Sequence, residues 1–131
     1  MDKLSTITLS GKEYPMRCSN FVLQEIQEKY KDLSEFERKL AGRIPALDEN
    51  GKQKYNDEGK KLYIQVETSL EAINFFLPLV VNEGIEVEAI LKNKEAKTLD
   101  PKQIIRMNDV SPYKLQEILL EEFFRAFEIK K

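Results

Sequence analysis

Carboxylates are the main groups in this sequence that could do acid–base or metal chemistry. The 131 residues include 23 Asp and Glu, one cysteine and no histidine. Without histidine the chain cannot form a Ser-His or Cys-His nucleophile pair, and an ordinary zinc site lacks its usual ligand. One cysteine permits no internal disulfide, so nothing indicates secretion. The composition therefore leaves the carboxylates as the groups to be weighed.

Glu25 and Glu28 are one helical turn apart, which places both on one helix face as in some carboxylate metal sites. Such a site needs partner carboxylates from other helices, for which Glu117, Glu121 and Glu122 are the candidates. Glu25 and Glu28, however, alternate with Gln and Lys and avoid the apolar positions of their own segment. This pattern is typical of a solvated helix face, and it predicts no metal site.

Two further features are weaker as chemistry. The segment 48–51 (DENG) followed by Asp57 and Glu58 superficially resembles a calcium loop, but the ligand alternation and the closing Glu are out of register. We expect a turn there.

Cys18 follows Arg17, which we expect to lower the pKa of the thiol a little, but no histidine can activate it. A buried or half-buried small residue is the expectation for Cys18. We predict no catalytic residue, no cofactor site and no enzyme activity.

The elements that position these residues predict an α+β fold, a mainly α-helical single domain over residues 1–131 with an N-terminal β-hairpin. The hairpin spans about 4–17, turns at Gly11 and has Pro15 in an edge strand. Helices follow over about 20–31 and 34–41. Ser19 or Asn20 is the expected N-cap of the first helix. The second has a capping box of Ser34 with Glu37 and a stop at Gly42.

The remainder contains a polar loop or hairpin excursion over 43–59, with a two-residue turn at Asn50-Gly51. A helix is expected over about 60–82, with a kink at Pro78 and an end at Gly84, and a further short helix within 86–97. Asp100-Pro101 and Ser111-Pro112 each combine an N-cap with a first-turn proline, so helices are expected over about 101–107 and 112–128. No internal repeat is expected.

The helix over 112–128 is apolar on two adjoining sides, which is wider than a one-sided surface helix requires. Two explanations stay open: the helix is sandwiched within the domain, or its second side meets another protein. For the second case, the predicted partner-binding residues are Tyr113, Leu120, Phe124 and Phe127.

Charge and hydropathy narrow the class of partner. The net charge is -2 with 34% charged residues and no block of Lys and Arg, which argues against nucleic acid. The N-terminus lacks the apolar core of a signal peptide, and the longest uncharged run, over 72–82, is too short for a bilayer span. A cytoplasmic location is expected, with no membrane partner.

Several segments in order resemble the short tail assembly chaperones of siphophages and prophages of Gram-positive bacteria. They are 7–17 (ITLSGKEYPMR), 23–30 (LQEIQEKY), 33–37 (LSEFE), 40–42 (LAG), 79–84 (LVVNEG) and 110–115 (VSPYKL) with the Phe-rich helix after it. The segment 43–59 looks like an insertion. The resemblance implies a non-enzymatic protein that keeps the helical tape measure protein soluble in the host cytoplasm and is absent from the mature virion. The resemblance implies the tape measure protein as partner, with the tail tube protein as a further candidate. A second copy of the chain is a separate candidate partner, and the sequence leaves the oligomeric state open.

Two alternatives remain at this stage. The first is another non-enzymatic phage or prophage component, a structural connector or a regulatory adaptor. The second is a carboxylate-metal hydrolase, which would need the acidic residues above to converge.

Overall fold

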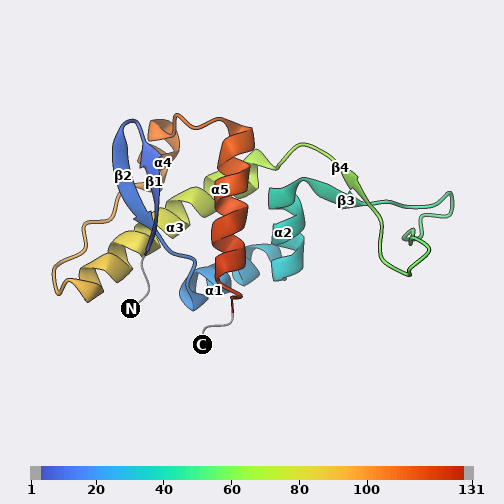
Figure 1. Cartoon of the computed structure of the whole chain (residues 1–131), viewed down its shortest axis with the longest axis horizontal. Coiled ribbons are helices and arrows are strands. Elements are labelled where there is room, and N and C mark those ends of the chain that lie inside the picture. The colour runs from blue at the N-terminus through green and yellow to red at the C-terminus, as the bar shows by residue number, and fades with distance from the viewer. Residues whose placement is uncertain (1–3, 129–131) are drawn as a thin grey trace.

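The computed structural model describes residues 4–128, which form five helices and two small sheets in a mainly helical α+β domain (Figure 1). The expected fold class is confirmed. Met1, Asp2 and Lys3, part of the segment expected to lack a signal peptide, lie outside the described residues. Within 4–128 no helix is long and apolar enough to cross a membrane.

The N-terminal hairpin pairs β1 (Ser5–Leu9) with β2 (Lys12–Met16) in antiparallel register, with Ile7 opposite Tyr14. Its two-residue turn places Ser10 and Gly11 at positive φ, as tight hairpin turns require. Alternate residues of both strands face the core. Because a hairpin alone is marginal in water, this face must pack on something, and it packs on a long central helix.

That central helix is α3 (Leu70–Leu91), and it contacts β2 and all four other helices (Figure 1). The helix expected over 60–82 is wrong at both ends. Ser69 caps the true N-terminus by accepting a hydrogen bond from the Ala72 N–H. Gly84 does not end the helix. It lies inside α3, where a Cβ would be 2.4 Å from the backbone of Pro15, so glycine permits the close approach of hairpin and helix. Within 86–97 there is no separate helix, because α3 continues to Leu91.

Two helices follow the hairpin, α1 (Asn20–Tyr30) and α2 (Leu33–Ala41). Ser19 is the N-cap of α1, as expected. The capping box at Ser34 is wrong, since Asp32 is the N-cap of α2 and accepts from the Glu35 N–H at 2.6 Å. Gly42 ends α2 in the left-handed conformation, as expected.

The C-terminal helices are α4 (Pro101–Met107) and α5 (Pro112–Arg125), each capped by the expected Asp100 or Ser111 with proline in the first turn. The helix α5 is shorter than the expected 112–128. It packs on α2 and α3 around a cluster of buried rings. Phe36 is at the centre of that cluster, with ring centroids 5.1 Å from Phe76 and 5.4 Å from Phe123.

The segment after α2 is an arm, residues 43–66, that projects from the body (Figure 1). At its base β3 (Arg43–Pro45) pairs antiparallel with β4 (Tyr63–Gln65). The excursion is therefore longer than the expected 43–59. Residues 62–66, expected to be helical, form and extend its return strand. Their apolar side chains at 62, 64 and 66 fit the period of a strand, and the hydrogen bonds to β3 select it.

The outer part of the arm contains an internal repeat, so the expectation of none is wrong. Residues 48–52 (DENGK) and 56–60 (NDEGK) form the same loop eight residues apart. In each loop the first side chain accepts two backbone N–H bonds and the glycine has positive φ. These are three-residue loops with a glycine bulge, not the expected two-residue turn at Asn50-Gly51.

The two loops and the base of the arm meet at a three-way junction. The N–H of Ala46 donates to the carbonyl of Leu62, that of Leu62 to Lys54, and that of Lys54 to Ala46, at 2.8–3.0 Å. The Gln53 amide nitrogen lies within 3.2 Å of all three carbonyls and donates into the centre. The junction thus satisfies its backbone groups without a third strand.

Candidate partner-binding site

An open groove of about 530 Å³ lies between α2, the base of the arm and α5. Its volume is in the range of sites that hold a small ligand or a few side chains. Its lining is mostly apolar and aromatic, with charged groups from α2 and β3. The lining residues are Leu33, Ser34, Glu37, Arg38, Arg43, Tyr63, Phe123, Phe124 and Phe127.

Aromatic rings form one wall of the groove. Phe123 is only 3% exposed, and its ring lies 5.7 Å from that of Phe124 and 5.2 Å from that of Phe127. Phe124 and Phe127 are 49% and 51% exposed. Phe123 in turn contacts the buried ring of Phe36. The two half-exposed rings therefore rest on rigid core and keep about half of their surface available to a partner.

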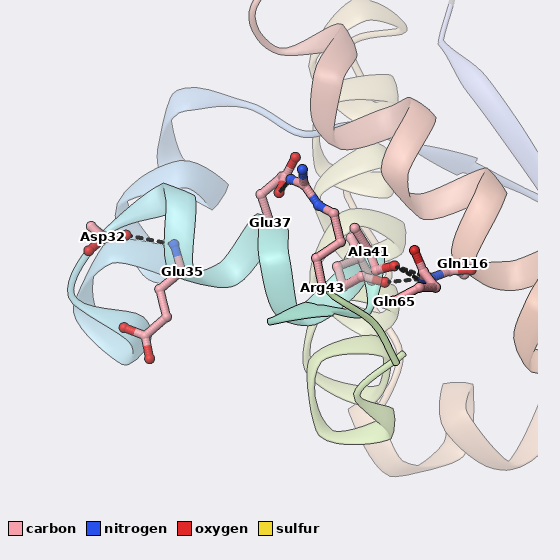
Figure 2. A network of polar contacts seen from close by, with 8 residues as sticks. Asp32, Glu35, Glu37, Ala41, Arg43, Gln65 and Gln116 are labelled. Atoms are coloured by element: carbon pink, nitrogen blue, oxygen red, sulfur yellow. Dashed lines mark hydrogen bonds and ion pairs between the residues drawn. The ribbon is translucent and has the colours of Figure 1, made fainter. Parts of the chain in front are cut away.

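The opposite rim is polar. The guanidinium of Arg43 donates to the carboxylate of Glu37 in an ion pair, and Figure 2 shows the two side chains pointing at one another. The same guanidinium lies 5.0 Å from the ring centroid of Tyr63 across the β3–β4 pair. This rim combines one charge of each sign, with hydrogen-bonding capacity, beside an apolar wall. Such a combination is typical of surfaces that bind amphipathic segments.

Side-chain hydrogen bonds to the end of α2 fix the walls of the groove relative to one another (Figure 2). The Gln116 amide on α5 donates to the carbonyls of Leu40 at 3.0 Å and Ala41 at 2.8 Å. The Gln65 amide on β4 donates to Ala41 at 3.1 Å. These bonds satisfy carbonyls that a helix C-terminus leaves unpaired, and they join α2, α5 and the arm at one point.

A glycine at the same point lets the arm leave the body. Gly42 has φ 76°, and a Cβ there would be 2.3 Å from the carbonyl oxygen of Val66. The Val66 N–H donates to the Gly42 carbonyl across this contact. A side chain at Gly42 would push the two strands apart, so the position of Arg43 and Tyr63 in the groove depends on it.

The structure brings together two of the four predicted partner-binding residues. Phe124 and Phe127 line the groove. Tyr113 is 74% exposed but lies in the first turn of α5, about 16 Å along the helix from Phe124, and does not line the groove. Leu120 is partly buried and packs against the core. One side of α5 is core, as the first explanation expects. Phe124 and Phe127 at the C-terminal end of the other side are about half exposed, and their contact with another protein stays a prediction.

The remaining lining residues were not predicted. Arg43 and Tyr63 come from strands that pair across the whole arm, and Leu33 comes from the start of α2. The alternation of apolar residues at 62, 64 and 66 with Tyr63 and Gln65 is typical of a strand, and it is the one sequence signal for the pairing of β4 with β3. No local signal indicates that this strand returns to α5.

Glu122 is a charged residue on the apolar side of α5, and its hydrogen bonds explain why it lies there. It is 2% exposed, and its carboxylate accepts hydrogen bonds from the Cys18 backbone N–H at 3.0 Å and from the Ser5 hydroxyl. Arg125 Nε lies 3.4 Å from the same carboxylate. Glu122 therefore connects the hairpin to α5, which is a structural role.

The other carboxylates do not converge. Glu117 and Glu121 are exposed on α5, Glu28 is exposed and accepts a bond from Gln24, and Glu25 is partly exposed. Among residues 4–128 no group of three or more metal-binding side chains occurs.

Cys18 is buried, as expected, but the direction expected for its pKa is wrong. Burial, which is the largest cause, and the nearby carboxylates of Glu122 and Glu83 together raise the pKa of the Cys18 thiol to about 12. These effects exceed any influence of Arg17. A thiol with this pKa stays protonated at neutral pH and is a poor nucleophile.

Comparisons with protein-family models, with curated proteins and with solved structures find no match to this chain. What the groove can do therefore follows from its own residues. It offers half-exposed aromatic rings on a rigid base and an ion pair at the rim, and these groups suit binding.

Proposed function

We propose that the protein is a tail assembly chaperone that binds a helical segment of a phage tape measure protein in the groove beside α5. The observation that carries this proposal is the pair of half-exposed rings, Phe124 and Phe127, held on buried Phe123. The ordered resemblance of the sequence to short tail assembly chaperones supports the identity of the partner. The chain would act in the host cytoplasm and leave before the virion is complete.

A helix of the partner would place apolar residues three and four positions apart against these rings. Helix-in-groove recognition uses this spacing. The Arg43–Glu37 pair at the rim would face polar residues of the partner, which favours one orientation of its helix. The charged exterior of the chain would keep the complex in solution.

Co-expression with a tape measure protein from the same locus tests the proposal. We expect the chain to raise the soluble fraction of the tape measure protein and to co-purify with it. The variant Phe124→Asp should lose both effects while remaining folded by circular dichroism. Phe21→Asp is a matched control, because Phe21 is a half-exposed ring on α1 that does not line the groove.

If neither solubility nor co-purification changes with the wild-type chain, the proposal is wrong. Mass spectrometry of purified particles separates it from the alternative of a structural connector. A connector persists in the mature virion, whereas the proposed chaperone does not.

A further inference from the structure

The strand β4 is an edge that can accept another strand. Within residues 4–128 its sheet has two strands in the order β3-β4. The bonds from Ala46 N–H to Leu62 and from Val66 N–H to Gly42 show that even-numbered residues of the return strand face β3. The backbone groups of Tyr63 and Gln65 therefore point away from it. The outer edge of β3 contains Pro45, which has no N–H to donate. Of the two edges, β4 is the one suited to pairing.

One face of the same strands is apolar. Ile44 and Ile64 lie directly opposite one another and are 46% and 51% exposed. Leu62 and Val66 lie on the same face by strand alternation and are also exposed. An exposed edge with an apolar face is a recognised site of strand pairing between chains.

We propose that β4 pairs antiparallel with β4 of a second copy of this chain, about a two-fold axis at Ile64. Tyr63 then faces Gln65 of the second copy, and Leu62 faces its Val66. Lys61 faces Glu67 of the second copy, and the symmetry forms this pair twice. The product is a four-stranded antiparallel sheet, β3-β4-β4-β3, with one continuous apolar face.

The register follows from the residues. The outward backbone groups belong to odd-numbered residues, so the axis must pass through a residue and not between two. An axis at Tyr63 would place Val66 opposite Lys60. An axis at Gln65 would place Leu62 opposite Thr68. The axis at Ile64 pairs apolar residues with apolar residues and joins opposite charges.

We assign the strand that pairs with the edge of β4 to a second copy of this chain, because the residues of β4 and its flanks are complementary to themselves in this register. In an isologous interface residue i meets residue j while j meets i, and Lys61 with Glu67 satisfies this condition. Both side chains are exposed and available to a partner. This inference goes beyond the proposed chaperone function, because it concerns the outer edge of the arm and not Phe124 and Phe127.

A charge-swap experiment tests the pairing by sedimentation equilibrium of the full chain. The wild type should dimerise with rising concentration. Lys61→Glu and Glu67→Lys each create two like-charge pairs, so each should raise the dimer Kd about tenfold, and the double variant should return it to within about twofold of wild type. Lys52→Glu is the matched control, since it makes the same charge change elsewhere on the arm and should not alter the Kd.

A cysteine placed on the axis tests the register. In the proposed sheet residue 64 faces its own copy as a non-hydrogen-bonded pair with Cα atoms about 4.5 Å apart, within the range that a disulfide bridges. Oxidised Ile64→Cys should therefore run as a covalent dimer, whereas Leu47→Cys, half-exposed nearer the tip, should not. Cys18 is buried and does not compete.

A wild type that is monomeric at every soluble concentration would overturn the inference. A double variant as weak as the singles, or equal cross-linking at positions 64 and 47, would do the same. These outcomes leave the chaperone proposal standing, because binding of the tape measure protein is measured separately with the Phe124 variants.

Discussion

Phe123 and Phe124 are neighbours on α5 with opposite surroundings, and replacing each by alanine separates core from interface. Phe123 packs against Phe36 and Phe76, so Phe123→Ala should cost about 3–5 kcal/mol of unfolding free energy. For a chain of 131 residues this corresponds to a fall in Tm of roughly 11–18 °C. Phe124 is half-exposed, so Phe124→Ala should cost less than about 1 kcal/mol.

Binding of the tape measure protein should depend on Phe124, although the loss of this ring has little effect on stability. A phenylalanine that keeps half of its surface has roughly 100 Å² left to bury, which is worth about 2.5 kcal/mol at about 25 cal/mol per Å². Its truncation should therefore weaken binding by at least about tenfold and at most about 70-fold. Phe21→Ala, at a half-exposed ring outside the groove, should leave binding unchanged.

Differential scanning calorimetry measures the first effect, and titration calorimetry with a purified tape measure segment measures the second. The reasoning is refuted if Phe124→Ala lowers Tm as much as Phe123→Ala, because Phe124 would then be core. It is equally refuted if Phe124→Ala and Phe21→Ala change binding alike, because the groove would then have no special role.

Three further outcomes are expected. Gly84→Ala should lower Tm clearly, although alanine favours helix, because its Cβ would collide with the backbone of Pro15; an unchanged Tm would show that the hairpin does not lie so close to α3. Glu122→Ala should cost about 2 kcal/mol in a denaturant titration, since the buried Cys18 N–H loses its acceptor, and a cost near zero would contradict that role. The Cys18 thiol, with its pKa raised to about 12, should stay protonated and unreactive toward a thiol reagent at pH 8 until denaturant is added; rapid labelling of the native chain would show that it is accessible.

Local signals in the sequence were sufficient for much of the fold. Ser19, Asp100 and Ser111 cap the helices as expected, and Gly42 ends α2. Each of these signals acts within one turn of the chain, so no knowledge of distant contacts was needed.

The secondary structure expected from the sequence was wrong where one segment fits two local structures and contacts with distant residues select one of them. Leu62, Val66 and Leu70 have helical spacing, but Ile64 completes an equally good strand pattern, and pairing with β3 decides the outcome. Gly84 resembles a helix stop, whereas its real neighbour is Pro15, almost seventy residues earlier. The candidate site divides in the same way: the rings of α5 could be predicted from its wide apolar sector, but the positions of Arg43 and Tyr63 could not.

Because of the three-way junction, the arm can gain or lose eight residues at a time, one loop per unit, without a change at its base. Removing residues 47–54 would join Ala46 to Tyr55 and leave Ala46 opposite Leu62, its present partner, across the one remaining loop. The base of the arm would keep its register, and a plain hairpin would replace the junction. The present arm is therefore what tandem duplication of one hairpin loop would generate. Such duplication adds a second loop beside the first at the tip of the arm, while the groove at the base of the arm stays unchanged.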